Sequence, residues 1–351
     1  MRIGLMGLED NFVRNTGLGI PVYMYELLKH LRKMEGKEGI KVEKIGYERQ
    51  RNELASFINM VFKSATEYYG NYDILHNPDV KPIFPRNRGR AVYVSTGHDY
   101  QPLLQPELDA DVNTTIKSRI KLLLEIRYSL KLTLKSDYLL ARSTLTRDDA
   151  VELGFDKSRI FVVGGAVDDR YRKPIRKRKT GKTFTVGYLG AFRTRKNVAF
   201  AIRSFKKIDD RNIRFDLWGK PVYEYDMLRR LAGNRRSIRF RGFAPEERMV
   251  DIYDSFDAFV FPSLYEGLCL PIFEAYARGL PVIIYKDARI PEETRKYCFE
   301  AENEVHMARI IEELKHEGYE ERRKKKAMDY ARGLTWEKTA KETLAAYKKM
   351  L

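Results

Sequence analysis

The sequence has few cysteines and no long apolar run, and each lack excludes a class of protein. Only two of the 351 residues are cysteine, Cys269 and Cys298, which is too few for a disulfide-rich secreted domain, and they do not have zinc-binding spacing. No apolar run approaches the ~18 residues that cross a membrane, and the N-terminal MRIGLMG lacks the layout of a signal peptide. We therefore expect a cytoplasmic protein that does not span a membrane.

The length of the chain and the distribution of its charge favour two domains joined by a basic linker. With 351 residues the chain is long enough for two cores of ordinary size. The net charge is +17, and its excess is C-terminal: residues 1–170 contain 26 Lys and Arg against 23 Asp and Glu, and residues 171–351 contain 40 against 26. Part of the excess is the run YRKPIRKRKTGK at 171–182, which we interpret as a linker. The alternative, a nucleic-acid-binding arm, lacks interleaved aromatic residues after Tyr171.

Alternating strands and helices predict an α/β fold, with a parallel sheet covered on both faces in each half of the chain. In the first half, the apolar runs expected to form strands are 3–6, 73–75, 91–95, 138–141 and 160–163. In the second half they are 184–189, 213–218, 238–243, 258–261 and 282–285. We expect an N-terminal domain, a basic linker, a C-terminal domain and a last helix that crosses back to the N-terminal domain, at 1–169, 170–183, 184–333 and 334–351.

Residues 258–286, AFVFPSLYEGLCLPIFEAYARGLPVIIYK, carry the strongest pattern in the chain. After an apolar run and a short loop, Pro271 opens a helix, and Gly279 ends it before a second apolar run. The pattern predicts a strand, loop, helix, strand unit, with Glu266 before the helix and Glu274 in its first turns. Both carboxylates can then face a ligand at the helix N-terminus, where free N–H groups and the helix dipole favour an anion such as a phosphate.

This segment resembles the sugar-nucleotide signature of retaining GT-B glycosyltransferases of family four. It has their order, Pro-Ser-x-x-Glu-Gly-x-x-x-Pro-x-x-Glu-Ala-x-Ala-x-Gly-x-Pro-Val. The resemblance implies a GT-B fold, in which two Rossmann-like domains face a central cleft. The family usually has a second glycine where this chain has Cys269, whose side chain narrows the approach of the backbone to a ligand. The structural alternative is an ordinary buried βαβ unit in which Glu274 is a solvated helix carboxylate.

Shorter segments are similar to the same family and add expected donor-binding positions. The loop after the first strand resembles the glycine loop that lies under the donor phosphates. The stretch VGYLGAFRTRKN resembles the one that neutralises the leaving diphosphate, although Ala191 replaces the family's arginine. FDLWGK and RGF stand where the family's backbone approaches the nucleotide and where it holds the base. Together these segments and the signature imply donor contacts at Gly17, Gly19, Gly190, Gly219, Arg241, Gly267, Leu268, Cys269, Leu270 and Glu274.

The resemblance also implies roles for the residues that carry the chemistry. Arg193 and Lys196, with the helix N-terminus after Gly267, would stabilise the leaving diphosphate by preorganised positive charge. Glu266 would hydrogen-bond hydroxyls of the donor sugar, and Glu274 would accept from both ribose hydroxyls. The leaving phosphate would itself remove the acceptor proton. The alternative for the two basic residues is a solvated basic turn.

Two histidines stand at the ends of expected strands, where open α/β sheets place their ligands. His98, in VSTGHDYQPLL, is the residue we expect near the reacting sugar, and His76, in YDILHNPDV, is the weaker candidate. For each, the alternative is a hydrogen-bonded structural histidine. The resemblance implies no metal and no cofactor. Asp109 and Asp111 match the Asp-x-Asp metal motif of the other glycosyltransferase fold, but they precede an expected helix in a loop.

The sequence therefore predicts a metal-independent, retaining glycosyltransferase that moves a hexose-type sugar from a nucleoside-diphosphate sugar to an acceptor hydroxyl. The acceptor can be a glycan, a lipid-linked molecule or a small molecule. Two alternatives remain: a non-catalytic protein of the same fold that binds nucleotides or a lipid surface, motivated by Ala191 and Cys269, or a nucleotide-sugar epimerase or phosphorylase. We expect no nucleic-acid partner. Abundant Lys, Arg and Glu beside three Gln are typical of a thermophilic source.

A basic segment raises the question of a membrane partner. Residues 113–135 contain six Lys and Arg against one Glu, with apolar residues at helical spacing. Such a helix could lie on an anionic membrane and present a lipid-linked acceptor. The alternative is a helix whose apolar stripe packs on the sheet and whose basic face is solvated.

Overall fold

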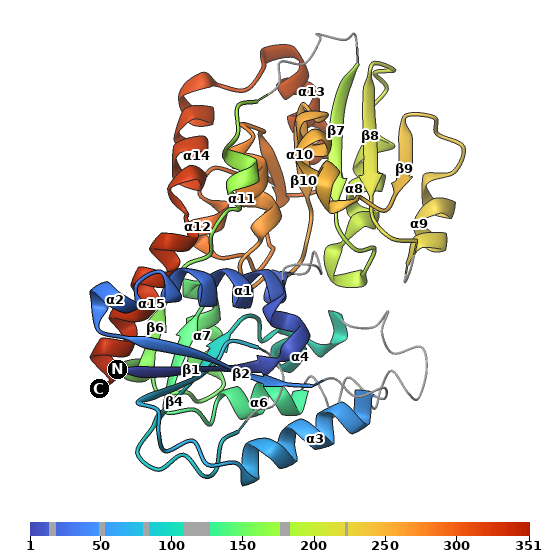
Figure 1. The fold of residues 1–351 in the computed structure, drawn as a ribbon. Coiled ribbons are helices and arrows are strands. Elements are labelled where there is room, and N and C mark those ends of the chain that lie inside the picture. The colour runs from blue at the N-terminus through green and yellow to red at the C-terminus, as the bar shows by residue number, and fades with distance from the viewer. Residues whose placement is uncertain (14–18, 49–52, 80–83, 109–126, 176–182, 222–223) are drawn as a thin grey trace. The chain divides into compact units, whose positions relative to one another are not determined.

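The computed structural model divides the chain into two compact units, which are described separately (Figure 1). Unit 1 contains the described residues of Met1–Gln105 and of Thr114–Ala166, together with Thr335–Leu351, and unit 2 contains 106–108 and Val167–Leu334. None of the described helices is long and apolar enough to cross a membrane. The structure describes residues 1–13, 19–48, 53–79, 84–108, 127–175, 183–221 and 224–351.

Unit 1 is built on a sheet of six parallel strands in the order β2-β1-β3-β4-β5-β6. The sequence predicted all of these strands except β2. That strand lies at the sheet edge, where Lys41, Glu43 and Lys44 break the apolar run that marks a central strand. The strands are β1 (Arg2–Leu8), β2 (Lys41–Tyr47), β3 (Ile74–Asn77), β4 (Val92–Gly97), β5 (Tyr138–Ala141) and β6 (Ile160–Val162).

Helices pack on both faces of this sheet because neighbouring residues of a strand point to opposite faces. Leu140 of β5 joins a core with Leu27 of α1 and Tyr347 of α15. The preceding Leu139 joins a second core with Leu130 of α6. The helices of unit 1 are α1 (Gly19–Arg32), α2 (Glu35–Glu38), α3 (Glu53–Thr66), α4 (Gln101–Leu104), α6 (Tyr128–Thr133), α7 (Thr144–Glu152) and α15 (Trp336–Met350).

The last helix, α15, belongs to unit 1 although the chain reaches it through unit 2. Thr335 caps its N-terminus: the Thr335 hydroxyl oxygen accepts a hydrogen bond of 3.0 Å from the Lys338 N–H. The Tyr347 hydroxyl lies 2.6 Å from Nδ1 of His76, and the Thr339 hydroxyl donates to the Gly164 carbonyl at 3.2 Å. These contacts anchor α15 to the sheet.

Unit 2 repeats the architecture with a second sheet of six parallel strands, in the order β12-β11-β10-β7-β8-β9 (Figure 1). Four of the predicted ranges, those of β7, β8, β10 and β11, coincide with the observed strands, whereas β12 at the edge was not predicted. The strands are β7 (Phe184–Leu189), β8 (Ile213–Trp218), β9 (Ile238–Gly242), β10 (Ala258–Phe261), β11 (Val282–Tyr285) and β12 (Phe299–Ala301). Two parallel sheets with helices confirm the expected α/β class.

Two apolar cores cover the two faces of this sheet. One contains residues of α8 and α13, and the other contains residues of α10, α11 and α14. In Figure 1, α11 and α14 lie side by side, and the two helices pack against each other. The helices of unit 2 are α8 (Val198–Phe205), α9 (Tyr225–Ala232), α10 (Met249–Asp254), α11 (Leu270–Ala277), α12 (Glu292–Arg295), α13 (Glu304–Glu317) and α14 (Glu321–Gly333).

A buried ion pair fixes the end of α11. The Arg278 side chain is fully buried, and its Nε and Nη2 donate to the two carboxylate oxygens of Asp254 at 2.6 Å each. Its Nη1 donates to the backbone carbonyls of Tyr171 and Lys173 at 3.0 and 2.6 Å. Arg278 therefore joins α10, α11 and the chain segment that enters unit 2.

We predict that Arg278→Met destabilises the protein by about 3–5 kcal/mol, because it leaves the Asp254 carboxylate buried without its partner. The free energy of unfolding in urea measures the effect. Arg322→Met, an exposed arginine of α14, is the control and should change the stability by less than about 0.5 kcal/mol. Equal effects of the two substitutions on the free energy of unfolding would contradict a stabilising role of the buried pair.

Candidate functional site

The sheet of unit 2 has a topological switch point between two neighbouring strands. From β7 the chain continues to β8 and β9 on one side, and from β10 it continues to β11 and β12 on the other. In open α/β sheets, ligands bind at the carboxyl ends of the strands beside such a point. The loops that follow β7 and β10 therefore form the candidate site of this unit, and they contain several of the residues predicted from the sequence: Gly190, Arg193, Lys196, Glu266, Gly267, Leu268 and Cys269.

A buried cluster of charges joins these two loops. Nζ of Lys196 contacts Oε1 of Glu266, and Nη1 of Arg195 lies 3.5 Å from Oε2 of the same carboxylate. Arg195 also donates to the Tyr265 carbonyl at 3.0 Å, and the Leu264 N–H donates to the Arg195 carbonyl at 2.9 Å. The sequence analysis singled out Lys196 and Glu266 separately. It assigned no role to Arg195, which contacts Glu266 from the position before Lys196.

Glu266 is ionised because its neighbours outweigh its burial. Only 8% of the residue is exposed. Burial alone would raise the pKa of Glu266, but the charges of Lys196 and Arg195 hold that pKa below its usual value. The site therefore contains an ionised carboxylate that faces two cations in a largely dry environment.

The two predicted glycines at the ends of β7 and β8 touch each other. The Gly190 N–H donates to the Trp218 carbonyl at 3.0 Å, and the Gly219 N–H donates to the Gly242 carbonyl at 2.8 Å. A Cβ at Gly219 would lie 2.3 Å from the Gly190 carbonyl oxygen, a distance that no side chain can occupy. Close packing of the strand ends therefore explains the glycine at 219 independently of any ligand.

Cys269 caps the N-terminus of α11 in a left-handed conformation, with φ of 64° and ψ of 54°. Glycine adopts this conformation without strain, which is a physical reason for a glycine at this place in related sequences. The Cys269 side chain lies in the apolar core beside α11, and burial raises the pKa of its thiol well above the usual value. The thiol is therefore neutral. Pro271 follows in the first turn of α11, as the sequence predicted.

Glu274 lies farther along α11 and has its own set of partners. The Tyr253 hydroxyl donates to Oε2 of Glu274 at 2.8 Å. Burial raises the pKa of Glu274 to about 7, although Tyr253 and Arg170 favour its charged form and Asp168 disfavours it. The two carboxylates of the signature segment are thus in different states: Glu266 is ionised, and Glu274 exchanges its proton near neutral pH.

We predict that Glu274 makes the stability of the protein depend on pH. Its pKa in the folded protein lies above the ordinary value of 4.5, so its contribution to stability is present below 4.5 and is lost as the pH rises through about 7. Unfolding measured across this range should show wild type losing stability relative to Glu274→Gln. Glu313→Gln, an exposed carboxylate of α13, is the control. Parallel curves for wild type and Glu274→Gln would contradict the assignment.

Unit 1 has a second cluster at the carboxyl ends of its strands. His98 follows β4, and its Nε2 donates to the Pro78 carbonyl at 2.8 Å. The His98 ring packs edge-on against the Tyr23 ring, with centroids 5.4 Å apart. The guanidinium carbon of Arg142, which follows β5, lies 4.0 Å from the centroid of the same tyrosine ring. The sequence analysis missed Tyr23 and Arg142, although the position of Arg142 at a strand end was a usable signal.

His98 and His76, the two histidines at the strand ends of unit 1, are both neutral. Burial and the charge of Arg142 lower the pKa of His98 to about 4, and the bond to Pro78 opposes this shift only in part. His76 is fully buried between Thr96 and Tyr347, and burial lowers its pKa to about 3. His76 thus fits the structural alternative. His98 is partly exposed, and because its Nε2 carries the proton given to Pro78, its Nδ1 is an acceptor.

The remaining predicted residues lie in several places. Gly19 is the first residue of α1, and Arg241 on β9 lies 3.8 Å from Asp216. Arg193 precedes the single turn that carries Lys196. No group of three or more His, Cys, Asp or Glu within the described ranges could hold a metal ion. Gly17, Asp109, Asp111, residues 113–126 of the basic segment and residues 176–182 of the linker lie outside the described residues.

Comparison with known proteins finds similarity to glycosyltransferases. Residues 183–317 match the family described as glycosyl transferases group 1. The chain is similar to O-antigen chain mannosyltransferase B of Escherichia coli, with 30% identity over 170 residues, which is 46% of this chain and 45% of that relative. The match thus spans less than half the length of that relative.

Solved structures of similar fold extend the likeness to the whole chain. A glycosyltransferase from Rickettsia africae ESF-5 has a TM-score of 0.69 and 15% identity, covering 99% of this chain and 98% of that one. Anabaena Alr3699/HepE, in complex with UDP and glucose, has a TM-score of 0.65 and 14% identity, covering 100% of both chains. These likenesses show the GT-B fold and confirm the fold expected from the sequence.

Proposed function

Because residues 183–317 match the family described as glycosyl transferases group 1, we propose that the protein moves a hexose-type sugar from a nucleoside-diphosphate sugar to an acceptor hydroxyl, with retention of configuration. The observation that carries this proposal is the buried cluster of Lys196, Arg195 and Glu266 at the switch point of the unit 2 sheet. It combines the positive charge that a leaving diphosphate requires with the acceptor oxygens that sugar hydroxyls require. No metal or cofactor enters the proposed reaction.

Binding of the donor would replace the contact between Lys196 and Glu266. In the proposed complex, Lys196 and Arg193 turn to the diphosphate, together with the backbone N–H groups at the start of α11. Glu266 then accepts hydrogen bonds from sugar hydroxyls and still faces Arg195. The ionised state of Glu266 supports this role, because a carboxylate that keeps its charge accepts from two hydroxyls at once.

Glu274 would hold the ribose of the donor. Its contact with Tyr253 keeps one carboxylate oxygen in place, and its pKa of about 7 makes the carboxylate state available at neutral pH. Binding of two ribose hydroxyls favours the charged form, so the donor should lower this pKa. Donor binding would therefore release a proton from Glu274 and weaken below about pH 7.

The acceptor side of the proposed reaction rests on unit 1. His98 is neutral there and offers its Nδ1 as an acceptor, and the buried cation of Arg142 lies next to it. A neutral histidine suits a contact to a sugar hydroxyl, and the leaving phosphate would take the acceptor proton. We further propose that the acceptor is a glycan or a lipid-linked molecule. A lipid-linked acceptor would agree with contact between the basic segment 113–135 and an anionic membrane.

We also propose that the reaction takes place in the cytoplasm. Both cysteines, Cys269 and Cys298, are free and buried, which suits a reducing compartment. The compartment can be tested only in the source cell, whereas the identity of the donor can be tested with the purified protein. Thermal unfolding against a panel of nucleoside-diphosphate sugars would find the donor, since a ligand at ~100 times its dissociation constant adds about 2.7 kcal/mol of stability.

We predict that Lys196→Ala lowers kcat more than it weakens donor binding, because negative charge on the leaving diphosphate grows in the transition state. Release of nucleoside diphosphate in the presence of acceptor measures the rate. Lys325→Ala, an exposed lysine of α14, is the control and should leave the rate unchanged. Wild-type turnover by Lys196→Ala would contradict the proposed role. Interconversion of sugars without release of nucleoside diphosphate would indicate an epimerase instead.

A further inference from the structure

Unit 2 contains a basic cavity at the opposite end of its sheet from the candidate donor site. The cavity has a volume of about 700 Å³ and is lined by Arg211, Arg214, Arg235, Arg236 and Arg239. We call it the arginine pocket. Part of the C-terminal excess of positive charge, which the proposed reaction does not use, is concentrated there.

The parallel sheet brings these arginines together. Arg211 precedes β8 and Arg236 precedes β9, while Arg214 and Arg239 are the second residues of the same two strands. The strands of a parallel sheet all run in one direction, so their amino ends lie at the same end of the sheet. The pocket therefore lies at the amino ends of β7, β8 and β9. The donor site lies at their carboxyl ends, about 20 Å away along a strand of six residues at ~3.3 Å each.

Two of the five arginines have structural partners. Nη1 of Arg235 donates to the Lys206 carbonyl at 2.6 Å, and its Nε lies 3.3 Å from the Ser237 hydroxyl. Nη2 of Arg214 donates to the Thr185 hydroxyl at 2.9 Å, and its Nε lies 3.2 Å from Oδ1 of Asp216. These contacts hold the walls of the pocket in place.

The other three arginines supply charge without a protein partner. Arg211, Arg236 and Arg239 are exposed, and no described residue forms an ion pair with them. Asp209 and Asp210 also line the pocket, but the Asp210 carboxylate is held by Lys315 and by the Asn212 N–H at 2.8 Å. Like charges gathered in one cavity repel each other, so an anion that enters between them is stabilised.

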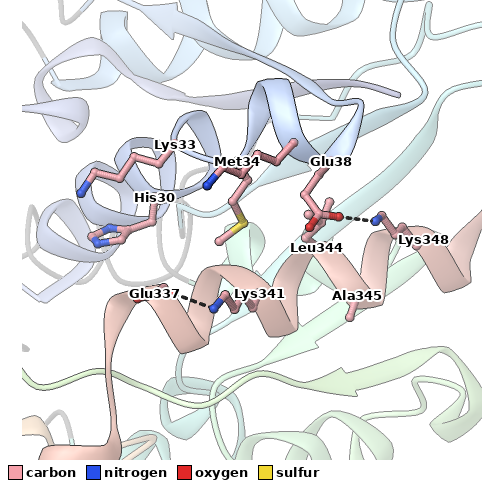
Figure 2. Close-up of a pocket in the computed structure, with 10 residues that line it drawn as sticks. His30, Lys33, Met34, Glu38, Glu337, Lys341, Leu344, Ala345 and Lys348 are labelled. Atoms are coloured by element: carbon pink, nitrogen blue, oxygen red, sulfur yellow. Dashed lines mark hydrogen bonds and ion pairs between the residues drawn. The ribbon is translucent and has the colours of Figure 1, made fainter.

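A hollow in unit 1 shows the contrast (Figure 2). It is also lined by lysines, but Lys348 is paired with Glu38 at 2.7 Å and Lys341 with Glu337 at 2.6 Å. The Glu38–Lys348 pair joins α2 to α15, and the Met34 side chain lies over α15. Two of its lysines are therefore neutralised by carboxylates, one within α15 and one between α2 and α15, unlike the three exposed arginines of the arginine pocket.

We propose that the arginine pocket binds a small anion that carries several phosphate groups. The planar guanidinium presents paired donors that match phosphate oxygens, and several unpaired guanidinium groups in one cavity favour a ligand with more than one such group. The described residues that line the pocket include no aromatic ring on which a base or a sugar could stack, and Ile213 is their one aliphatic side chain. The described lining therefore offers no aromatic surface for stacking and little apolar surface for an acyl chain. The proposal does not depend on the glycosyl-transfer reaction.

Titration calorimetry with inorganic tripolyphosphate at constant ionic strength tests this proposal. Wild type should bind tripolyphosphate, and Arg236→Gln combined with Arg239→Gln should bind it at least tenfold more weakly. The control removes two exposed arginines elsewhere in unit 2, Arg309→Gln with Arg322→Gln, and should bind within twofold of wild type. Lys196→Ala separates the pocket from the donor site and should also bind within twofold of wild type.

Thermal unfolding provides a second readout that does not require binding heat. Tripolyphosphate should raise the Tm of wild type and of the control but leave that of the Arg236, Arg239 double variant unchanged. Three results would overturn the proposal: no binding by wild type, equal weakening in the control, which would mean attraction to net charge alone, or loss of binding in Lys196→Ala, which would place the anion in the donor site. The first of these leaves the proposed transfer reaction untouched.

Discussion

The contact of Glu266 with Lys196 and Arg195 is the interaction on which the candidate site depends. It joins the loop after β7 to the loop after β10 and places an anion between two cations in an environment with little water. A buried ion pair of this kind adds little net stability, because the cost of removing the charges from water offsets their attraction. Its role is to position the groups. A ligand that carries both an anionic diphosphate and sugar hydroxyls can replace the contact between Lys196 and Glu266, because the diphosphate binds the cation and the hydroxyls bind the carboxylate.

The position of this pair follows from the order of the strands. β7 and β10 are neighbours, and the chain leaves them in opposite directions, so no helix crosses the gap between their carboxyl ends. The glycines at 190 and 219 let the ends of β7 and β8 approach closely. α11 then starts at Leu270, four residues after Glu266, and the positive end of its dipole adds to the positive potential. The same parallel arrangement brings together the amino ends of β7, β8 and β9, and the arginines of the arginine pocket lie there, at the opposite end of the strands from the candidate site.

The central strands of both sheets were predictable from the sequence because each is an apolar run that must be buried on both faces. Two of the four edge strands, β6 and β9, were also predicted. The other two, β2 and β12, were not, because charges such as Lys41 and Glu300 interrupt their apolar residues. Glu266 and Glu274 stood out by the pattern around them, and Lys196 by the resemblance of its segment to the family. The pairing of Lys196 with Glu266 depends on strand order, which local pattern does not reveal. The contact from Tyr253 to Glu274 and the packing of Arg142 on the Tyr23 ring depend on tertiary structure, which the local sequence does not reveal.

The most direct test of the account compares the affinity of the protein for a nucleoside diphosphate with its affinity for the matching sugar nucleotide. If Lys196 serves the diphosphate and Glu266 serves the sugar, Lys196→Met should weaken both ligands by the same factor. Glu266→Gln should weaken only the sugar nucleotide, so that the ratio of the two dissociation constants changes in that variant alone. An unchanged ratio in Glu266→Gln would contradict the claim that this buried pair is built to hold a sugar-nucleotide donor.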